Sequence, residues 1–226
     1  MSKVHADYFP RNISQYVPLM EFAADVINGQ CLVNLGAPIA IDLDGIWDGV
    51  TADASINTYT SADFKSTFGA SNVTGNVGEI DAIYGRALTC TGSTGSDHVL
   101  VISGRDYLGQ AMSETFTLNG TTPDVGNKAF KFVDTMVIQA GAASDTCDVG
   151  WNDKLGVPYA MESMASFRED TVVTSPTVVA SVTTTATTST GDTRGTVIPA
   201  SSTDGSNVHE AFFNVNTDNM HGVVQA

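Results

Sequence analysis

The stretch that decides the fold is residues 111–118, which read AMSETFTL. Met112, Glu114, Phe116 and Leu118 alternate with alanine, serine and threonine residues. Successive side chains of a β-strand point to opposite faces, so this period of two predicts a strand with one largely apolar face and one hydroxylated face.

Similar segments lie on both sides of this stretch. They are residues 86–91 (RALTCT), 98–103 (HVLVIS) and 129–138 (AFKFVDTMVI), with loops of turn-forming residues between them. Because short links favour antiparallel neighbours, we predict an antiparallel meander. The predicted fold class is therefore all-β, mainly an antiparallel sandwich or barrel-like, with an N-terminal arm and a minor helix.

The remaining segments are patterned more weakly. We expect one or two short strands within 31–41, an acidic turn at 42–49, a short helix around 62–68, a strand end followed by a tight loop at 148–158, strand structure within the Val- and Thr-rich residues 171–190, and a last strand at 211–215. No solenoid repeat is visible. We predict two parts, an arm of residues 1–30 and a β-rich core domain of residues 31–226.

The predicted arm crowds large apolar side chains into a short span. The spacing of the apolar residues over 19–27 is compatible with a short amphipathic helix that begins after Pro18 and ends at Asn28-Gly29. Aromatic and methionine side chains often anchor protein contacts, so we predict a docking arm. The expected contact residues are Tyr8, Phe9, Tyr16, Met20 and Phe22.

The net charge argues against two classes of partner. The chain has 10 Lys and Arg residues against 25 Asp and Glu residues, which gives a formal net charge of −15. A phosphate backbone is bound by clustered cations, whereas the basic residues here are scattered singly. We therefore expect neither nucleic acid nor an anionic membrane as a direct partner.

Hydropathy gives an expectation about location. Residues 1–10 contain no apolar segment of signal-peptide length, and the most apolar stretch, residues 31–41, is interrupted by Asn34, Gly36 and Pro38. We expect synthesis in the cytoplasm, which the protein leaves only by lysis.

The spacing of reactive residues indicates no catalytic site. Cys31, Cys90 and Cys147 form no C-x-x-C pair, so we expect buried free thiols and neither a zinc site nor a disulfide framework. The histidines occur singly, and the motifs H-E-x-x-H and G-x-S-x-G are absent. We predict no enzymatic activity, no catalytic residues and no cofactor.

Two acidic or charged groups leave alternatives open. Asp42, Asp44 and Asp48 could offer oxygen atoms to Ca²⁺, but the loop order is wrong and no closing Glu follows, so we expect a solvated acidic turn and no metal site. The pairs Arg105-Asp106 and Asp192-Arg194 are interpreted as turn-stabilising residues that could also pair across subunits.

Three runs of residues suggest a family. They are residues 104–110 (GRDYLGQ), 113–120 (SETFTLNG) and 128–133 (KAFKFV), and residues 191–199 (GDTRGTVIP) with Asp204-Gly205 follow in the C-terminal part. This pattern resembles one that recurs in virion structural proteins of tailed bacteriophages, most closely the capsid decoration, or cement, proteins. The resemblance covers the chain from about Gly85 onward.

The resemblance implies a function without catalysis. A cement protein binds the outside of the phage capsid and bridges subunits of the major capsid protein, and we expect a homotrimer located on the virion surface. One alternative is a structural component of the tail or neck. Another is a glycan-binding module displayed on the particle surface, with Trp47, Trp151 or Tyr107 as stacking platforms.

Overall fold

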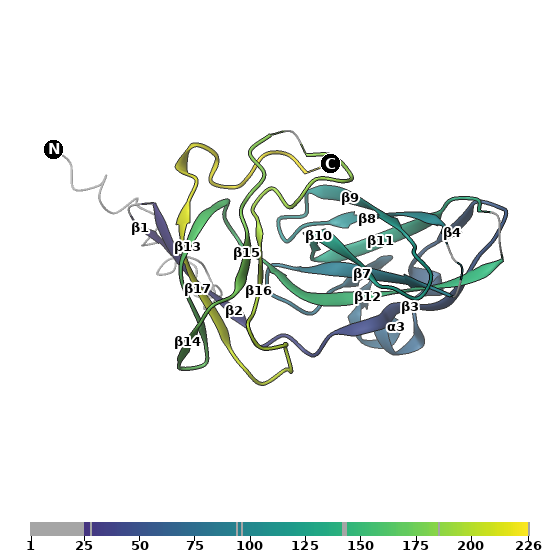
Figure 1. Ribbon diagram of the computed structural model, residues 1–226, viewed down its shortest axis with the longest axis horizontal. Coiled ribbons are helices and arrows are strands. Elements are labelled where there is room, and N and C mark those ends of the chain that lie inside the picture. Colours follow the sequence, from purple (N-terminus) through teal and green to yellow (C-terminus); the bar gives the residue numbers. More distant parts are fainter. Residues whose placement is uncertain are drawn as a thin grey trace.

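The chain forms three antiparallel β-sheets, which confirms the predicted all-β fold class. The computed structural model describes residues 25–27, 29–93, 95, 97–141, 144–184 and 186–225. Figure 1 shows one sheet at one end of the long axis and two packed sheets at the other.

Sheet A has the strand order β1-β2-β17-β13-β14 and comprises β1 (Asp25–Ile27), β2 (Gln30–Gly36), β17 (His209–Val215), β13 (Met161–Glu169) and β14 (Val172–Thr174). Sheet B has the order β10-β7-β12-β16-β15 and comprises β10 (Asp124–Phe130), β7 (Arg86–Gly92), β12 (Asp145–Gly156), β16 (Thr196–Ile198) and β15 (Thr177–Val179), with β3 (Asp42–Ala52) paired to β12. Sheet C has the order β5-β6-β11-β8-β9 and comprises β5 (Val73–Thr74), β6 (Val77–Glu79), β11 (Phe132–Ile138), β8 (Val99–Arg105) and β9 (Ala111–Thr117), with β4 (Asn57–Tyr59) paired to β11. The helical elements are the 3₁₀ turns η2 (Ser61–Asp63) and η3 (Thr217–Asn219) and the helix α3 (Ser66–Asn72).

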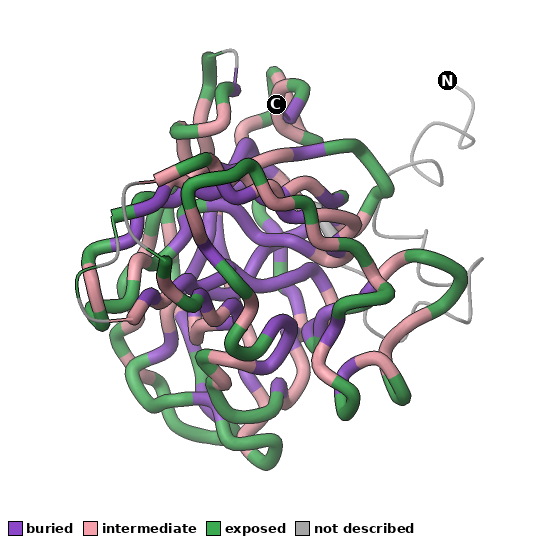
Figure 2. Tube along the Cα trace, turned by 90° about the vertical axis from the view of Figure 1, so that its right-hand side faces the viewer, coloured by how far each residue is buried: buried purple, intermediate pink, exposed green. Residues whose placement is uncertain are grey.

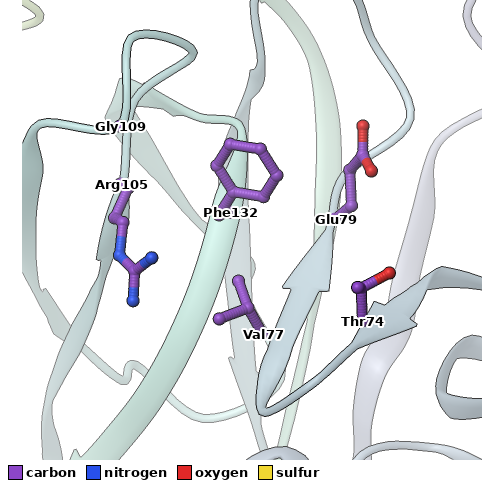
Figure 3. A pocket seen from close by; sticks show the side chains of 6 residues that line it. All are labelled: Thr74, Val77, Glu79, Arg105, Gly109 and Phe132. Atoms are coloured by element: carbon purple, nitrogen blue, oxygen red, sulfur yellow. The ribbon is translucent and has the colours of Figure 1, made fainter.

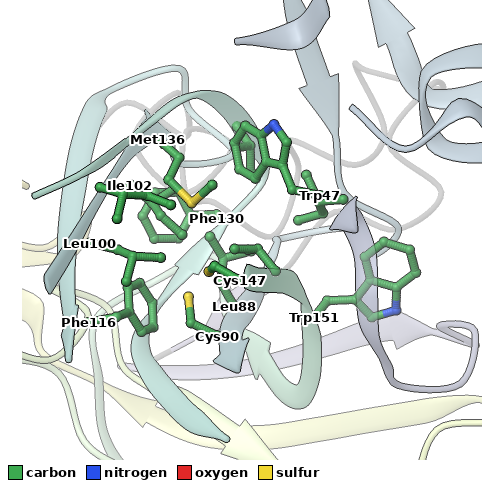
Figure 4. Packing of buried hydrophobic residues seen from close by; sticks show 14 of the residues in the cluster. Trp47, Leu88, Cys90, Leu100, Ile102, Phe116, Phe130, Met136, Cys147 and Trp151 are labelled. Atoms are coloured by element: carbon green, nitrogen blue, oxygen red, sulfur yellow. The ribbon is translucent and has the colours of Figure 1, made fainter. Parts of the chain in front are cut away.

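Sheets B and C pack face to face as a sandwich. Figure 4 shows Leu88 and Phe130 from sheet B beside Leu100, Ile102 and Phe116 from sheet C, all of them buried. Inward side chains of two stacked sheets interdigitate in this way because each strand buries alternate residues. The apolar alternation at residues 111–118 thus lines the sandwich core, as predicted.

Aromatic side chains pack around α3, which contacts β3 of sheet B and β5 and β6 of sheet C. Trp47 contacts Phe64 at a ring-centroid distance of 5.0 Å, and Phe68 of α3 lies 6.0 Å from Trp151. The predicted helix around residues 62–68 corresponds to η2 followed by α3, and Thr60 caps η2 by accepting a hydrogen bond from the Ala62 amide.

Sheet A builds a second core against the end of the sandwich. Its inner face carries Val33, Phe167 and Phe213, which pack with Leu155 of β12 and Val197 of β16. Figure 2 shows buried residues running through the strands of the interior, while the exposed residues lie mainly in the loops. The long strand β12 therefore contributes to both cores.

The predicted meander is right only for its central hairpin. β8 and β9 pair antiparallel in sheet C, but β7 and β10 on either side of them belong to sheet B. Residues 129–138 are two strands: Phe130 pairs with Arg86 in sheet B, whereas Phe132 pairs with Arg105 in sheet C. The chain changes sheets at Lys131. Alternating burial shows that a strand has one buried face, but it does not identify the neighbouring strand.

Residues 42–49 do not form the predicted acidic turn, because they belong to the eleven-residue strand β3. Gly45 permits this strand, since a Cβ atom there would lie 2.5 Å from the Trp151 ring. Likewise residues 148–158 are not a strand end and tight loop, because β12 continues through Gly156.

The prediction of strand structure for residues 171–190 is only half right. β14 and β15 lie within this span, but the described residues from 180 to 190 form no strand. Here the Thr190 hydroxyl accepts a hydrogen bond from the Thr187 amide (2.8 Å), and the Thr188 carbonyl accepts one from Thr115 (2.9 Å) at the edge of sheet C. Threonine hydroxyls that bond to nearby backbone compete with a regular ladder.

The predicted helix over residues 19–27 is wrong in its last part. Residues 25–27 form β1, which pairs with β2 in sheet A, and residues 19–24 lie outside the described part of the chain. The final segment of the predicted arm therefore belongs to sheet A.

Candidate functional site

Two turns whose sequences are typical of the protein surface are joined by a buried ion pair. Arg194 Nη1 lies 2.9 Å from Asp106 Oδ2, and their side chains are 1% and 0% exposed. The guanidinium also lies over the Tyr107 ring, 4.9 Å from its centroid. A buried charge is tolerated only when it is paired, so this pair ties the turn before β9 to the turn before β16.

Backbone amides hold both carboxylates of these turns. Asp106 accepts hydrogen bonds from the amides of Leu108 and Gln110, at 2.9 and 2.8 Å. Asp192 accepts from the Arg194 amide at 2.8 Å and from the Ala129 amide of β10 at 3.0 Å. The prediction of turn-stabilising residues is confirmed for Asp106 and Asp192, whereas Arg105 pairs with Asp134 of β11. Asp106 and Arg194 pair within one chain.

Arg86 forms a second buried polar centre near sheet A. Its guanidinium donates to the carbonyls of Asn152 and Ile39, both at 2.8 Å, and to the Thr203 hydroxyl at 2.9 Å. Asp153 lies 3.4 Å away as the counter-charge. Burial lowers the pKa of Arg86 to about 10, because the low-dielectric surroundings disfavour the charged form.

A third buried centre joins Glu114 to two lysines. The Glu114 carboxylate accepts hydrogen bonds from the amides of Asn127 (2.5 Å) and Lys128 (3.4 Å), and Lys154 Nζ donates to the Gly126 carbonyl at 2.6 Å. Burial raises the pKa of Glu114 to about 7 and lowers the pKa values of Lys128 and Lys154. Gly126 makes this approach possible, because a Cβ atom there would lie 2.6 Å from Glu114 Oε2.

The pH dependence of stability should report the burial of Glu114. Its pKa is about 7 in the fold against an ordinary value of 4.5, so the folded state binds the proton more tightly and stability falls as the pH rises from 4.5 through 7. The shift corresponds to on the order of 3 kcal/mol. We expect Glu114→Gln to remove this dependence, as measured by urea unfolding between pH 5 and pH 8.

His209 also contributes to the pH dependence of stability, so wild type must be compared with the Glu114→Gln variant. Burial lowers the pKa of His209 below 6.5, so its contribution is lost as the pH falls, opposite in sign to that of Glu114. The quantity to measure is therefore the difference in free energy of unfolding between wild type and the Glu114→Gln variant. If this difference stays constant across the pH range, Glu114 is not the source of the pH dependence.

No family model, curated protein or solved structure matches this chain.

The outer face of sheet A is the clearest candidate for a binding surface. Leu32 and Phe212 are cross-strand partners on this face, and Leu32 is 57% exposed. A polar row, Gln30-Asn214-Ser163, runs along one side of them with hydrogen bonds of 3.3 and 2.8 Å. An apolar centre with a polar rim is the usual anatomy of a protein interface.

The other side of the apolar pair is also polar. Arg168 and Glu210 are cross-strand partners with a charge separation of 3.9 Å, and Val173, paired with Arg168, is 68% exposed. β1, where the predicted arm joins the core, lies at the edge of this same sheet (Figure 1).

A surface hollow of about 250 Å³ lies over sheet C. Figure 3 shows Arg105 and Glu79 on opposite sides of Phe132 in this hollow. Arg105 lies 3.3 Å from Asp134, and Glu79 lies 2.8 Å from Lys131, so both charges at the rim already have partners. The hollow therefore offers no unpaired charge to a ligand.

The structure places the predicted site residues as follows. Tyr8, Phe9, Tyr16, Met20 and Phe22 lie outside the described residues, so the docking residues stay a prediction. The thiols of Cys31, Cys90 and Cys147 are buried, as predicted, and none of them takes part in a disulfide.

The acidic residues of β3 have a cation beside them. Lys65 Nζ lies 2.8 Å from Asp44 and 3.5 Å from Asp48. In the described part of the chain, no cluster of His, Cys, Asp and Glu could hold a metal ion. Within the same residues, no helix has the length and apolar character to cross a bilayer.

The aromatic residues proposed for glycan stacking are unsuitable. Trp47 and Trp151 are 0% and 6% exposed, and the Tyr107 ring is covered by Arg194 and Tyr84. A sugar needs an open ring face, so these side chains cannot serve as platforms.

Sequence reasoning missed the buried charges and the outer face of sheet A. Glu114 gave the only signal, as a charged residue on the apolar side of a predicted strand.

Proposed function

We propose that this chain is a virion structural protein without enzymatic activity, which binds the outside of a phage capsid and bridges subunits of the major capsid protein. The observation that carries the proposal is the outer face of sheet A, where Leu32 and Phe212 form an apolar centre beside the root of the N-terminal arm. The arm contributes Tyr8, Phe9, Tyr16, Met20 and Phe22 to the contact. The protein acts as a homotrimer on the virion surface.

The rest of the molecule suits a bridging role. Charged side chains inside the fold are engaged with partners, as the 2.9 Å Arg194–Asp106 pair shows, so they stabilise the fold. A bridge needs a stiff body, because a flexible one would lose binding free energy to ordering. The net charge of −15 suits a position outside the shell, away from packaged DNA.

Deleting the arm tests the proposal. The deletion should cover residues 2–24, so that β1 is kept and sheet A stays intact. We expect at least about a tenfold loss of affinity for shells assembled without the protein, since buried aromatic anchors carry most interface energy. Occupancy is measured by cosedimentation and by imaging the particles. Undiminished binding would refute the arm assignment, and density at the tail or neck would favour that location instead.

A matched pair of substitutions tests the sheet face. Leu32 and Ile56 are similarly exposed, at 57% and 63%, but only Leu32 lies on sheet A. We expect Leu32→Ser to reduce shell occupancy and Ile56→Ser to leave it unchanged, because the loss of apolar contact matters only inside the interface. Equal effects of the two substitutions would contradict this choice of surface.

A further inference from the structure

A lysine, an asparagine and a buried carboxyl group meet beside β10. Lys154 Nζ donates a hydrogen bond to Asn127 Oδ1 at 3.3 Å and to the Gly126 carbonyl at 2.6 Å. Glu114 accepts a hydrogen bond from the backbone amide of the same Asn127, at 2.5 Å. The Lys154 amine is therefore held beside the Asn127 side-chain amide by two hydrogen bonds, one to that amide and one to the Gly126 carbonyl.

The surroundings favour chemistry between these groups. Glu114 is 2% and Lys154 is 7% exposed, and desolvation favours the neutral amine, which is the nucleophilic form. The raised pKa of Glu114, about 7, suits a group that accepts and returns a proton near neutral pH. Asn127 is on the exposed side of β10, so a small leaving group has a route to solvent.

We propose that Lys154 and Asn127 form an intramolecular isopeptide bond, with Glu114 transferring the protons. The Glu114 carboxylate acts on the Lys154 ammonium electrostatically but forms no ion pair with it, so the two side chains must first approach each other. A proton then passes from the Nζ ammonium to the Glu114 carboxylate, and the neutral Nζ attacks Cγ of Asn127. A second Nζ proton reaches Nδ2 through the carboxyl group, the Cγ–Nδ2 bond breaks, and ammonia leaves. Glu114 returns its remaining proton to the ammonia, which departs as ammonium, so no other reactant is required.

The bond would join β10 to β12, which are separated by β7 in sheet B. Asn127 and Lys154 are 27 positions apart, so the bond closes a covalent loop in the sandwich. A crosslink of this kind restricts the unfolded chain and resists reduction, unlike a disulfide.

Mass spectrometry of the full chain decides the proposal. We expect the intact mass to fall short of the sequence mass by one ammonia molecule, and a protease digest to contain the peptides of Asn127 and Lys154 joined together. A wild-type protein with the full sequence mass and separate peptides would overturn it, whatever the variants show.

Two variants separate the bond from a succinimide at Asn127, which would also lose ammonia. In Lys154→Arg the deficit should disappear, because arginine cannot form the bond, whereas a succinimide would persist and would overturn the proposal. In Glu114→Gln the rate of crosslinking should fall at least about a hundredfold, the lower end for losing a proton-transfer group. Lys65→Met is the control, because Lys65 lies at the surface and pairs with Asp44 of β3. This variant should keep the full mass deficit.

Discussion

Replacing Asp106 with asparagine is expected to lower the free energy of unfolding by about 3 to 5 kcal/mol, the range for removing one partner of a buried ion pair. Arg194, 1% exposed, would remain buried and charged without its counter-charge. Asparagine keeps an oxygen that can accept from the Leu108 and Gln110 amides, so the turn itself is preserved. Urea unfolding at pH 7 measures the loss.

Asp204 provides the matched control. Its carboxylate accepts from the Ser206 and Asn207 amides at 2.8 and 3.0 Å, as Asp106 does in its own turn, but it is exposed. Asp204→Asn should therefore have a much smaller effect. Equal losses for the two variants would show that the turn, and not the ion pair, is what Asp106 stabilises. Adding Arg194→Met to Asp106→Asn should recover part of the stability, because the unpaired charge is then removed.

Replacing Gly150 with alanine is expected to prevent folding. A Cβ atom at this position would lie 1.8 Å from the Asp42 carbonyl oxygen and 2.7 Å from the Leu43 carbonyl carbon, both backbone atoms of β3. No side-chain movement relieves such a contact, so β3 would have to separate from β12. The expected result is loss of soluble folded protein, measured by expression yield and circular dichroism.

Gly69 is the control for that substitution. It lies within α3, and the nearest atom outside the helix backbone to an added Cβ, the Phe64 Cβ atom, is 3.9 Å away. Alanine is about 0.5 to 1 kcal/mol more favourable than glycine inside a helix, so Gly69→Ala should be neutral or stabilising. A folded Gly150→Ala protein with unchanged stability would contradict the close packing of β3 on β12.

The sequence predicted strands well where burial alternates strictly. Residues 111–118 became β9, because Met112 and Phe116 bury one face of a sheet whose other face is less covered. It failed for residues 42–49, because Gly45 and the acidic residues are typical of turns and the covering Trp151 is distant in sequence. It also failed for the threonine run, where hydroxyl groups bond to local backbone.

The candidate sites were less predictable than the strands. The pairing of Asp106 with Arg194 depends on two turns that only the fold brings together. Leu32 alternates with buried residues of β2, but nothing in the sequence shows which side of that strand is left uncovered. Glu114 was visible as an exception to the apolar pattern, yet its partners, the backbone amides of Asn127 and Lys128, come from another strand, β10.

The order of strands in sheet A has a consequence for synthesis on the ribosome. β2 leaves the ribosome long before its partner β17, because Gln30 and Asn214 are 184 positions apart. Most strands of sheets B and C emerge in between and can pair first, while the apolar side of β2 waits for its cover. Nascent chains that stall before β17 would therefore expose that strand to chaperones and proteases.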